Sequence, residues 1–217
     1  MVHGHNRHWR LSKRIMLGIL IGHGPGWTIS LGIVVLILLL GLGCAHTRVT
    51  VEGQDRLPPS KLIAQEFSTT LRSELNKAIE NGGPAGAIAV CQGISPRMEE
   101  QFSARYPEVL RVRRISLQTR NPQTHMPTVE EKRWLLSAQE AAQNKKPVEP
   151  GWIITRQKTT VLFPITINDP VCLLCHGEPA HMMEEVKTAL RAHYPQDQAT
   201  GYQFGDFRGA LAIEWRN

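Results

Sequence analysis

The feature that constrains this chain most is a pair of cysteines three positions apart, Cys172 and Cys175, followed at once by His176. This spacing is typical of the attachment site of a c-type haem. Two thiols on one short turn can each form a thioether to a neighbouring vinyl group, and the imidazole beside them then lies under the iron as proximal ligand. The motif therefore predicts one covalent haem c, held by these three residues.

A zinc site or a local disulfide is the alternative interpretation of the same motif. Structural zinc is usually closed by four protein ligands drawn from two short cysteine or histidine pairs. The sequence contains no second Cys-x-x-Cys pair and no His-x-x-x-His pair to complete such a site. Haem is therefore the favoured interpretation, and zinc and a disulfide remain the alternatives.

The net charge of +6 arises largely at the N-terminal end of the chain. The first 44 residues hold four basic residues and no acidic ones, whereas the whole chain holds 25 basic and 19 acidic residues. The rest of the chain is thus almost neutral and lacks the concentrated basic face of a nucleic-acid-binding protein. We expect no nucleic-acid partner. The length of 217 residues suits one domain with an appendage.

The N-terminal segment predicts export. A basic patch runs from Arg7 to Arg14, and the uncharged run from Trp27 to Gly43 is about long enough to cross a bilayer as a helix. Residues 1–44 are therefore predicted to be a signal peptide or a membrane-targeting helix, with the following chain in the periplasm. Three fates stay open: a retained helix, cleavage with a lipid on Cys44, and release after cleavage. We expect one of the two anchored forms.

The remaining chain predicts a tether followed by one folded domain. Residues 45–59 are polar and contain two adjacent prolines, which indicates a tether, and residues 60–217 form the predicted domain. Ser60 is the predicted N-cap of an amphipathic helix that ends at Gly82-Gly83-Pro84. Further helices are predicted for 128–144, where Thr128 is the cap, and 180–193, and strands for 110–117, 152–155, 161–168 and 209–215. This order predicts an α+β fold with a PAS-like antiparallel sheet flanked by helices. Pro164 is expected at a sheet edge or bulge.

Three further side chains are candidates for the site. Cys91 ends a run of small apolar residues that would let a flat ligand approach the backbone, and its alternative is an inert buried thiol. Arg114 lies in the strand predicted for 110–117, and Arg120 lies in the turn that follows. A charge in such a strand protects a sheet edge or pairs with a buried carboxylate such as a haem propionate.

Three local patterns together resemble one known family. They are Ala87-Ile88-Ala89-Val90-Cys91, residues 113–117 running into Arg120-Asn121-Pro122, and Cys172-x-x-Cys175-His176-Gly177. The chain resembles a family of single-haem, PAS-like exported domains, typified by a cyanobacterial haem protein and also found as sensor regions of bacterial signalling proteins. The resemblance covers residues 60–217 and implies His176 as proximal and Cys91 as distal ligand of the iron. One departure is Thr124, which stands where the family often has a second Asn.

The resemblance implies a redox or gas sensor module at the outer face of the membrane. Such a module would act through a separate signalling or redox partner protein. A single-haem electron-transfer cytochrome is the alternative, because one haem and a membrane tether suit it equally. We expect no enzyme, since a peroxidase needs an open distal face with an acid–base histidine. The candidates His125, His181 and His193 are predicted to be surface or loop residues.

Overall fold

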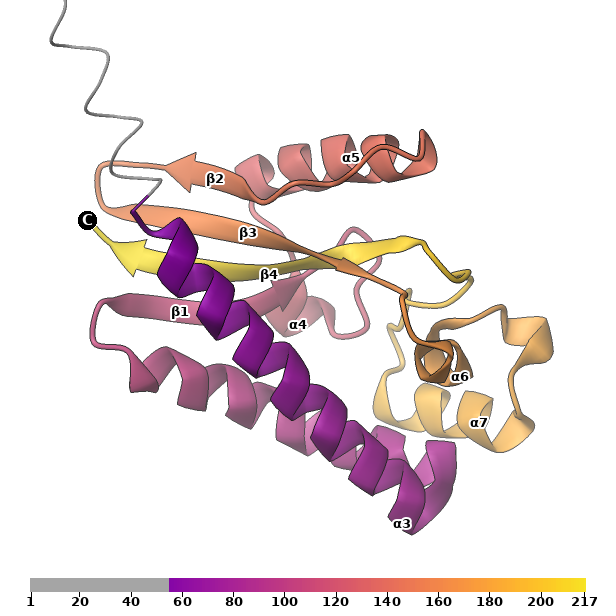
Figure 1. The fold of residues 1–217 in the computed structure, drawn as a ribbon. Helices are drawn as coiled ribbons and strands as arrows, with labels where there is room; N and C mark the ends of the chain where they lie inside the picture. The colour runs from indigo at the N-terminus through magenta and orange to yellow at the C-terminus, as the bar shows by residue number, and fades with distance from the viewer. Residues whose placement is uncertain (1–54) are drawn as a thin grey trace, which may run out of the picture. The chain divides into compact units, whose positions relative to one another are not determined.

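The computed structural model describes residues 55–217, which form a four-stranded antiparallel sheet with helices against it (Figure 1). The sheet order is β1-β4-β3-β2, and the strands are Val109–Ile115 (β1), Gly151–Ile154 (β2), Lys158–Thr166 (β3) and Phe207–Arg216 (β4). The helices are α3 (Leu57–Arg105), α4 (Pro122–His125), α5 (Val129–Gln143), α6 (Leu173–His176) and α7 (Glu184–His193), with 3-10 turns η1 (Pro170–Cys172) and η2 (Pro179–His181). The predicted α+β class, with an antiparallel sheet flanked by helices, is confirmed. Its PAS-like assignment stays a prediction.

Helix α3 covers one face of the sheet and is broken in the middle. Gly83 has a φ of 66° and a ψ of 178°, a backbone conformation that only glycine adopts readily. The two halves of α3 then lie side by side, with the rings of Phe67 and Phe102 5.3 Å apart (Figure 1). Both rings belong to a core cluster with residues of β1, β3 and β4: Val112, Val161, Leu211 and Ile213. The predicted end of the first helix at Gly82-Gly83-Pro84 is thus confirmed as a break.

The predicted N-cap of α3 is wrong. The helix begins at Leu57, and Arg56 occupies the N-cap position without a side-chain hydrogen bond. Ser60 is buried one turn further on, where its Oγ accepts a hydrogen bond of 2.8 Å from Nε1 of Trp215. The hydroxyl therefore serves a tertiary contact between α3 and β4. Helix α3 also takes in the last three residues of the segment predicted as a tether, 57–59.

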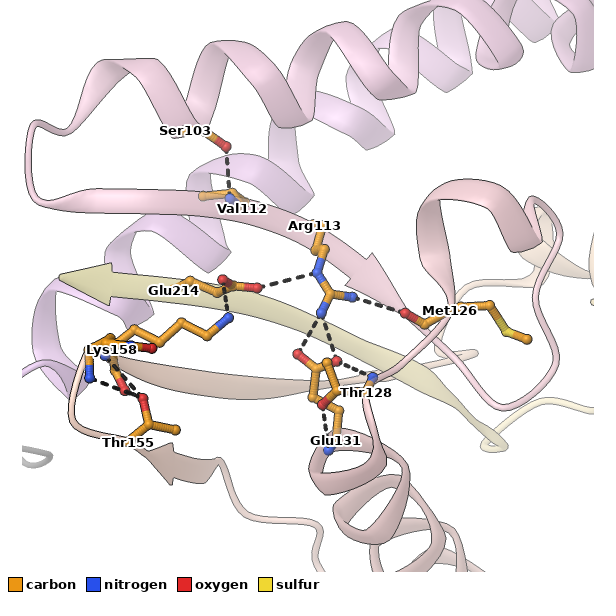
Figure 2. Close-up of polar contacts among 10 residues, drawn as sticks. Ser103, Val112, Arg113, Met126, Thr128, Glu131, Thr155, Lys158 and Glu214 are labelled. Carbon is orange, nitrogen blue, oxygen red and sulfur yellow. Dashed lines mark hydrogen bonds and ion pairs between the residues drawn. The ribbon is translucent and has the colours of Figure 1, made fainter.

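Helix α5 covers the opposite face of the sheet. Leu135 and Ala138 pack there against Ile115 and Leu162. The predicted cap is confirmed, because Thr128 and Glu131 form a reciprocal capping box at its start. Figure 2 shows that the Glu131 carboxylate also accepts hydrogen bonds from Arg113 of β1. The polar network continues from Arg113 to Glu214 of β4 and from there to Lys158 of β3.

Pro164 lies in the part of β3 that pairs with β4 alone. Strand β2 pairs only with residues 159–162 of β3, so the side of Pro164 away from β4 faces no strand of the described sheet. A proline cannot donate to a ladder and is tolerated at such an edge. A register shift follows between Ile165 and Thr166. The expectation of an edge or bulge at this proline is confirmed.

None of the helices within residues 55–217 is long and apolar enough to cross a bilayer. The predicted signal peptide or anchor, including Cys44, and most of the predicted tether lie outside the described residues. Their assignments stay predictions.

Candidate functional site

The Cys-x-x-Cys-His motif lies on a short helical turn beyond the end of β3. Asp169 begins the turn, because its Oδ1 accepts a hydrogen bond of 3.0 Å from the N–H of Val171. Turn η1 then passes directly into α6, which ends at His176. Figure 1 shows α6 next to α7 at one end of the sheet. The motif thus lies against helices at the end of a sheet.

The three cysteines of the described domain carry free, half-buried thiols. Burial raises the pKa of both Cys172 and Cys175, so these thiols are protonated in the bare protein. Because Cys172 and Cys175 are both free, the disulfide alternative does not describe this structure. No three His, Cys, Asp or Glu side chains between residues 55 and 217 gather as a metal-binding group. The four-ligand zinc site considered as an alternative is not found in this part of the chain.

His176 is held in one tautomer by a backbone carbonyl. Its Nδ1 lies 2.7 Å from the oxygen of Ala199, and a carbonyl only accepts hydrogen bonds, so Nδ1 carries the proton and Nε2 holds the free lone pair. Desolvation of the ring, and then the charge of Arg120, hold the pKa of His176 well below its usual value. A neutral imidazole whose other nitrogen is fixed by a hydrogen bond is the form that binds a metal.

A strap of chain at residues 199–202 supports the histidine. The N–H of Tyr202 donates to the carbonyl of His176 over 3.0 Å, and the N–H of Gly201 donates to that of Gly177 over 2.8 Å. The ring of Tyr202 stands edge-on to the imidazole, with centroids 6.2 Å apart. Gly177 leaves no room for a side chain, because a Cβ there would lie 2.6 Å from the carbonyl oxygen of Leu173. The end of α6 is therefore closely fitted to this strap.

Cys91 approaches the motif from the second half of α3. It lies near enough to Cys175 for its charge to raise the pKa of that thiol. Ile88, one turn before it, belongs to a core cluster that also contains Met182 and is packed against Cys175. Burial raises the pKa of Cys91, and the charges of Arg114 and Arg120 oppose that shift. The structure thus brings the predicted distal ligand to the motif, while its role stays a prediction.

The two arginines predicted to pair with propionates both lie beside the site and both have protein partners. Arg114 hydrogen-bonds to Ser95, and its Nε lies 3.1 Å from Oε1 of Glu99. Arg120 donates from Nη2 to the carbonyls of Cys175 and Ala199, and its Nε lies 3.2 Å from Oδ2 of Asp197. These contacts neither require nor exclude a propionate, so that role stays a prediction for both.

The three histidines considered for acid–base chemistry lie in three different environments. His125 donates from Nε2 to Glu99 over 3.1 Å, and the neighbouring Thr124 has a buried Oγ1 without a hydrogen-bond partner among residues 55–217. His193 exchanges hydrogen bonds of 2.9 Å with Gln92, the residue after Cys91. His181 is exposed. The departure from the family pattern at Thr124 thus coincides with an unsatisfied hydroxyl.

Two cavities lie beside these elements. One of about 340 Å³ is lined by Met182, Leu190 and Tyr194 together with Asp197. The other, of about 220 Å³, lies between Gln92, Arg120, His193 and again Tyr194. The second cavity therefore reaches Gln92, the neighbour of Cys91, and Arg120, which donates to the carbonyls of Cys175 and Ala199.

The sequence analysis missed the residues that support His176 and Arg120 from later in the chain. Ala199 and Tyr202 act through backbone groups and a ring contact, and Asp197 acts through its carboxylate. All three lie 21 to 26 positions after His176, and no local pattern marks such contacts. It also missed Arg208, whose guanidinium lies 5.2 Å from the centre of the Tyr202 ring. A single basic residue at the start of a strand carries no signal of its own.

The comparisons with known proteins agree with the resemblance found in the sequence. The model of the Tll0287-like family matches residues 54–215 of the chain. Among solved structures, that of the cyanobacterial haem protein Tll0287 has 20% sequence identity and a TM-score of 0.48, over 73% of this chain and 96% of that one. No match is found among curated proteins. Because the family match covers all but the last two residues of the described domain, the chain belongs to the Tll0287-like family.

Proposed function

We propose that the domain is a c-type haem protein. Cys172 and Cys175 would hold one haem through thioether bonds, His176 would bind the iron as proximal ligand, and Cys91 would bind it as distal ligand. Each thiol adds across one vinyl group and its hydrogen passes to a vinyl carbon, so the attachment consumes no electrons. The bound group supplies an iron that alternates between the ferric and ferrous states. Membership of a family named after a cyanobacterial haem protein supports this proposal.

The observation that carries the proposal is the hydrogen bond of 2.7 Å from Nδ1 of His176 to Ala199. It leaves the Nε2 lone pair unused, on the residue directly after a free thiol. The donor set fits a haem, because two thiols on one turn, a neutral imidazole beside them and a third thiol near the second make the contacts such a group needs. Closed zinc coordination would need further ligands.

Co-expression of the chain with a haem-attachment system tests the proposal. We expect a pyridine haemochrome spectrum of c type and a mass increase of one haem per chain. Replacement of Cys172 or Cys175 by Ala should remove one thioether each. Cys91→Ala is the matched control, because it should leave the covalent attachment intact. A haemochrome of b type, or an unchanged mass, contradicts the proposal.

We further propose a redox or gas sensor role. Cys91 lies on the half of α3 that follows the break at Gly83, and this half packs on α7 through the cluster of Ile88, Met182, Val186 and Leu190. Gln92 adds two hydrogen bonds to His193 at the end of α7. Release of the thiol from the iron would therefore disturb the contact between two helices, which a separate partner protein could detect.

An electron-transfer cytochrome is the second candidate, because a single covalent haem close to a membrane also suits a carrier. The two roles differ in what happens on reduction. Fast reduction that keeps both axial ligands favours the carrier. Loss of the thiolate and binding of carbon monoxide or nitric oxide to the reduced protein favour the sensor. We propose no enzymatic activity.

We also propose that the chain is exported to the periplasm and stays on the membrane through residues 1–44, as a helix or by a lipid on Cys44. The basic patch before the apolar run supports this orientation. Fractionation of cells should recover the haem protein with the membranes. Cys44→Ser should release it only if a lipid is the anchor. Recovery of most of the unsubstituted protein in the soluble periplasm contradicts the proposal.

A further inference from the structure

Arg208 places a guanidinium beside the candidate haem site with part of its hydrogen-bonding capacity unused. Its Nη1 donates to Oγ of Ser116 over 2.7 Å and to the carbonyl of Gln118 over 3.1 Å. The Ser116 hydroxyl in turn donates to the backbone carbonyl of Arg208 over 2.8 Å, so the side chain is anchored at one edge. Its Nε is buried and has no hydrogen-bond partner among residues 55–217. A buried donor without a partner is costly, and an acceptor from outside the described chain, such as a ligand or a bound water, would remove that cost.

The charges around the site are also unbalanced. Three guanidiniums, those of Arg114, Arg120 and Arg208, lie near enough to His176 to lower its pKa. Arg114 has Glu99 as its carboxylate and Arg120 has Asp197. Nε of Arg120, like that of Arg208, makes no hydrogen bond within residues 55–217, but it lies 3.2 Å from the Asp197 carboxylate. Arg208 forms no ion pair within the described domain. Burial lowers the pKa of Arg208 to about 10. The charges of Arg120 and Arg114 act in the same direction, while Tyr202 and Asp197 oppose the shift.

The position of Arg208 relates this unbalanced charge to the proximal histidine. The guanidinium lies 5.2 Å from the centre of the Tyr202 ring, and that ring stands edge-on to His176 with centroids 6.2 Å apart. Only one aromatic ring therefore separates the cation from the proximal imidazole. Nη1 is occupied by Ser116 and Gln118, which follow β1, while Nε and Nη2 form the opposite edge of the guanidinium. This edge is the one that binds a carboxylate through two parallel hydrogen bonds.

We propose that Arg208 binds a carboxylate of the cofactor, a haem propionate, through Nε and Nη2. This assignment rests on the proposed haem function. The propionate supplies the buried acceptor that Nε of Arg208 lacks and the negative charge that Arg208, alone of the three arginines, lacks. Arg114 and Arg120 keep their own carboxylates, so the assignment requires no rearrangement of either ion pair.

The test compares variants of the haem-loaded protein by resonance Raman spectroscopy, which reports the bending vibrations of the propionates. Arg208→Gln should shift a propionate band, because the charged bidentate partner is lost. Arg208→Lys should shift it in part, since lysine keeps the charge without the planar fork. Arg216→Gln is the matched control, because Arg216 is exposed at the other end of the same strand. Its propionate bands should equal those of the unsubstituted protein.

Thermal unfolding supplies a second readout. Arg208→Gln should lower the melting temperature of the haem-loaded protein by more than it lowers that of the haem-free protein, because only the loaded form has the ion pair. An equal effect in both forms overturns the assignment.

Three other outcomes are also decisive. A propionate band that Arg208→Gln leaves in place, with haem attached, overturns the assignment and leaves the haem proposal standing. An unsubstituted chain that takes up no haem overturns both. Succinate tests for a free carboxylate at this position. If succinate raises the melting temperature of the loaded unsubstituted protein but not that of loaded Arg208→Gln, the position binds a free carboxylate and the propionate assignment is overturned.

Discussion

Nη2 of Arg113 donates to both carboxylate oxygens of Glu131, over 2.6 and 2.7 Å, and this ion pair joins β1 to the first turn of α5 (Figure 2). The two side chains are only 4% and 3% exposed. The same carboxylate accepts the N–H of Thr128 over 2.8 Å in the capping box. Nε of Arg113 also lies 3.4 Å from Glu214 of β4. The buried guanidinium of Arg113 therefore joins the sheet to α5, on the face of the sheet opposite α3.

Replacement of Glu131 by Gln should destabilise the domain strongly. The substitution leaves the buried Arg113 with a weakened set of acceptors and removes the charge from the capping box. Breaking one partner of a buried pair typically costs about 3 to 5 kcal/mol. Urea unfolding measures the loss. Glu130→Gln is the control, because Glu130 is the exposed neighbour, and equal stability of the two variants contradicts the prediction.

Replacement of Gly177 by Ala should damage the end of the haem motif. The added Cβ would lie 2.6 Å from the Leu173 carbonyl oxygen, a backbone atom that cannot move without disturbing α6. Forced overpacking of this kind costs about 1 to 3 kcal/mol. We expect lower stability of the haem-free domain in urea and a lower yield of covalent haem. Gly82→Ala is the control, since a Cβ at Gly82 meets nothing within 4 Å. A Gly177→Ala variant as stable as Gly82→Ala rules the prediction out.

The parts of the fold set by local patterns could be predicted from the sequence. The capping box at Thr128 and Glu131, the break at Gly83 and the edge position of Pro164 each follow from the chemistry of one or two residues. The motif at Cys172 to His176 is local as well. Each of these features needs only neighbouring residues to form.

The parts set by distant contacts could not be predicted. Ser60 looked like a cap because its partner, Trp215, lies 155 positions away. The support of His176 by Ala199 and the anchoring of Arg208 by Ser116 depend on segments brought together by the sheet. A periodic pattern shows which face of an element is apolar, but it does not show which polar group a buried side chain will meet.

Acidification should lower the stability of the domain, in part through the buried His125. Burial lowers its pKa, and the charge and hydrogen bond of Glu99 only partly oppose that shift, while Arg114 and Arg208 add to it. The folded domain therefore binds this proton more weakly than the unfolded chain does. The stability due to neutral His125 is present above the unfolded pKa of about 6.5 and falls as the pH drops below it.

His125→Gln tests this dependence. The variant should lose less stability between about pH 7 and pH 5 than the unsubstituted domain, because glutamine does not titrate. Urea unfolding of the haem-free domain at several pH values gives the slope, and the difference between the two proteins isolates His125 from His176. His181→Gln, an exposed histidine, should keep the original slope. Parallel profiles for His125→Gln and the unsubstituted domain would falsify the assignment.

Replacement of Cys91 by Ala should convert a low-spin ferric haem spectrum to high spin. Burial raises the pKa of this thiol, whereas the charges of Arg114 and Arg120 lower it, so the thiolate needs the additional positive charge of ferric iron. Thiolate ligation by Cys91 would favour the ferric state, because reduction would remove one positive charge from the iron and weaken the bond. Alanine supplies no donor, so the distal position is left without a strong-field ligand.

Absorption and EPR spectra of the ferric protein measure the spin state. Val90→Ala is the matched control, because Val90 is the adjacent residue of α3 and is 43% exposed. It should keep the low-spin signal. Carbon monoxide should bind reduced Cys91→Ala at least as readily as the reduced unsubstituted protein, since no thiol competes for the iron. A low-spin signal that persists unchanged in Cys91→Ala identifies another residue as the distal ligand, and the switch based on Cys91 fails with it.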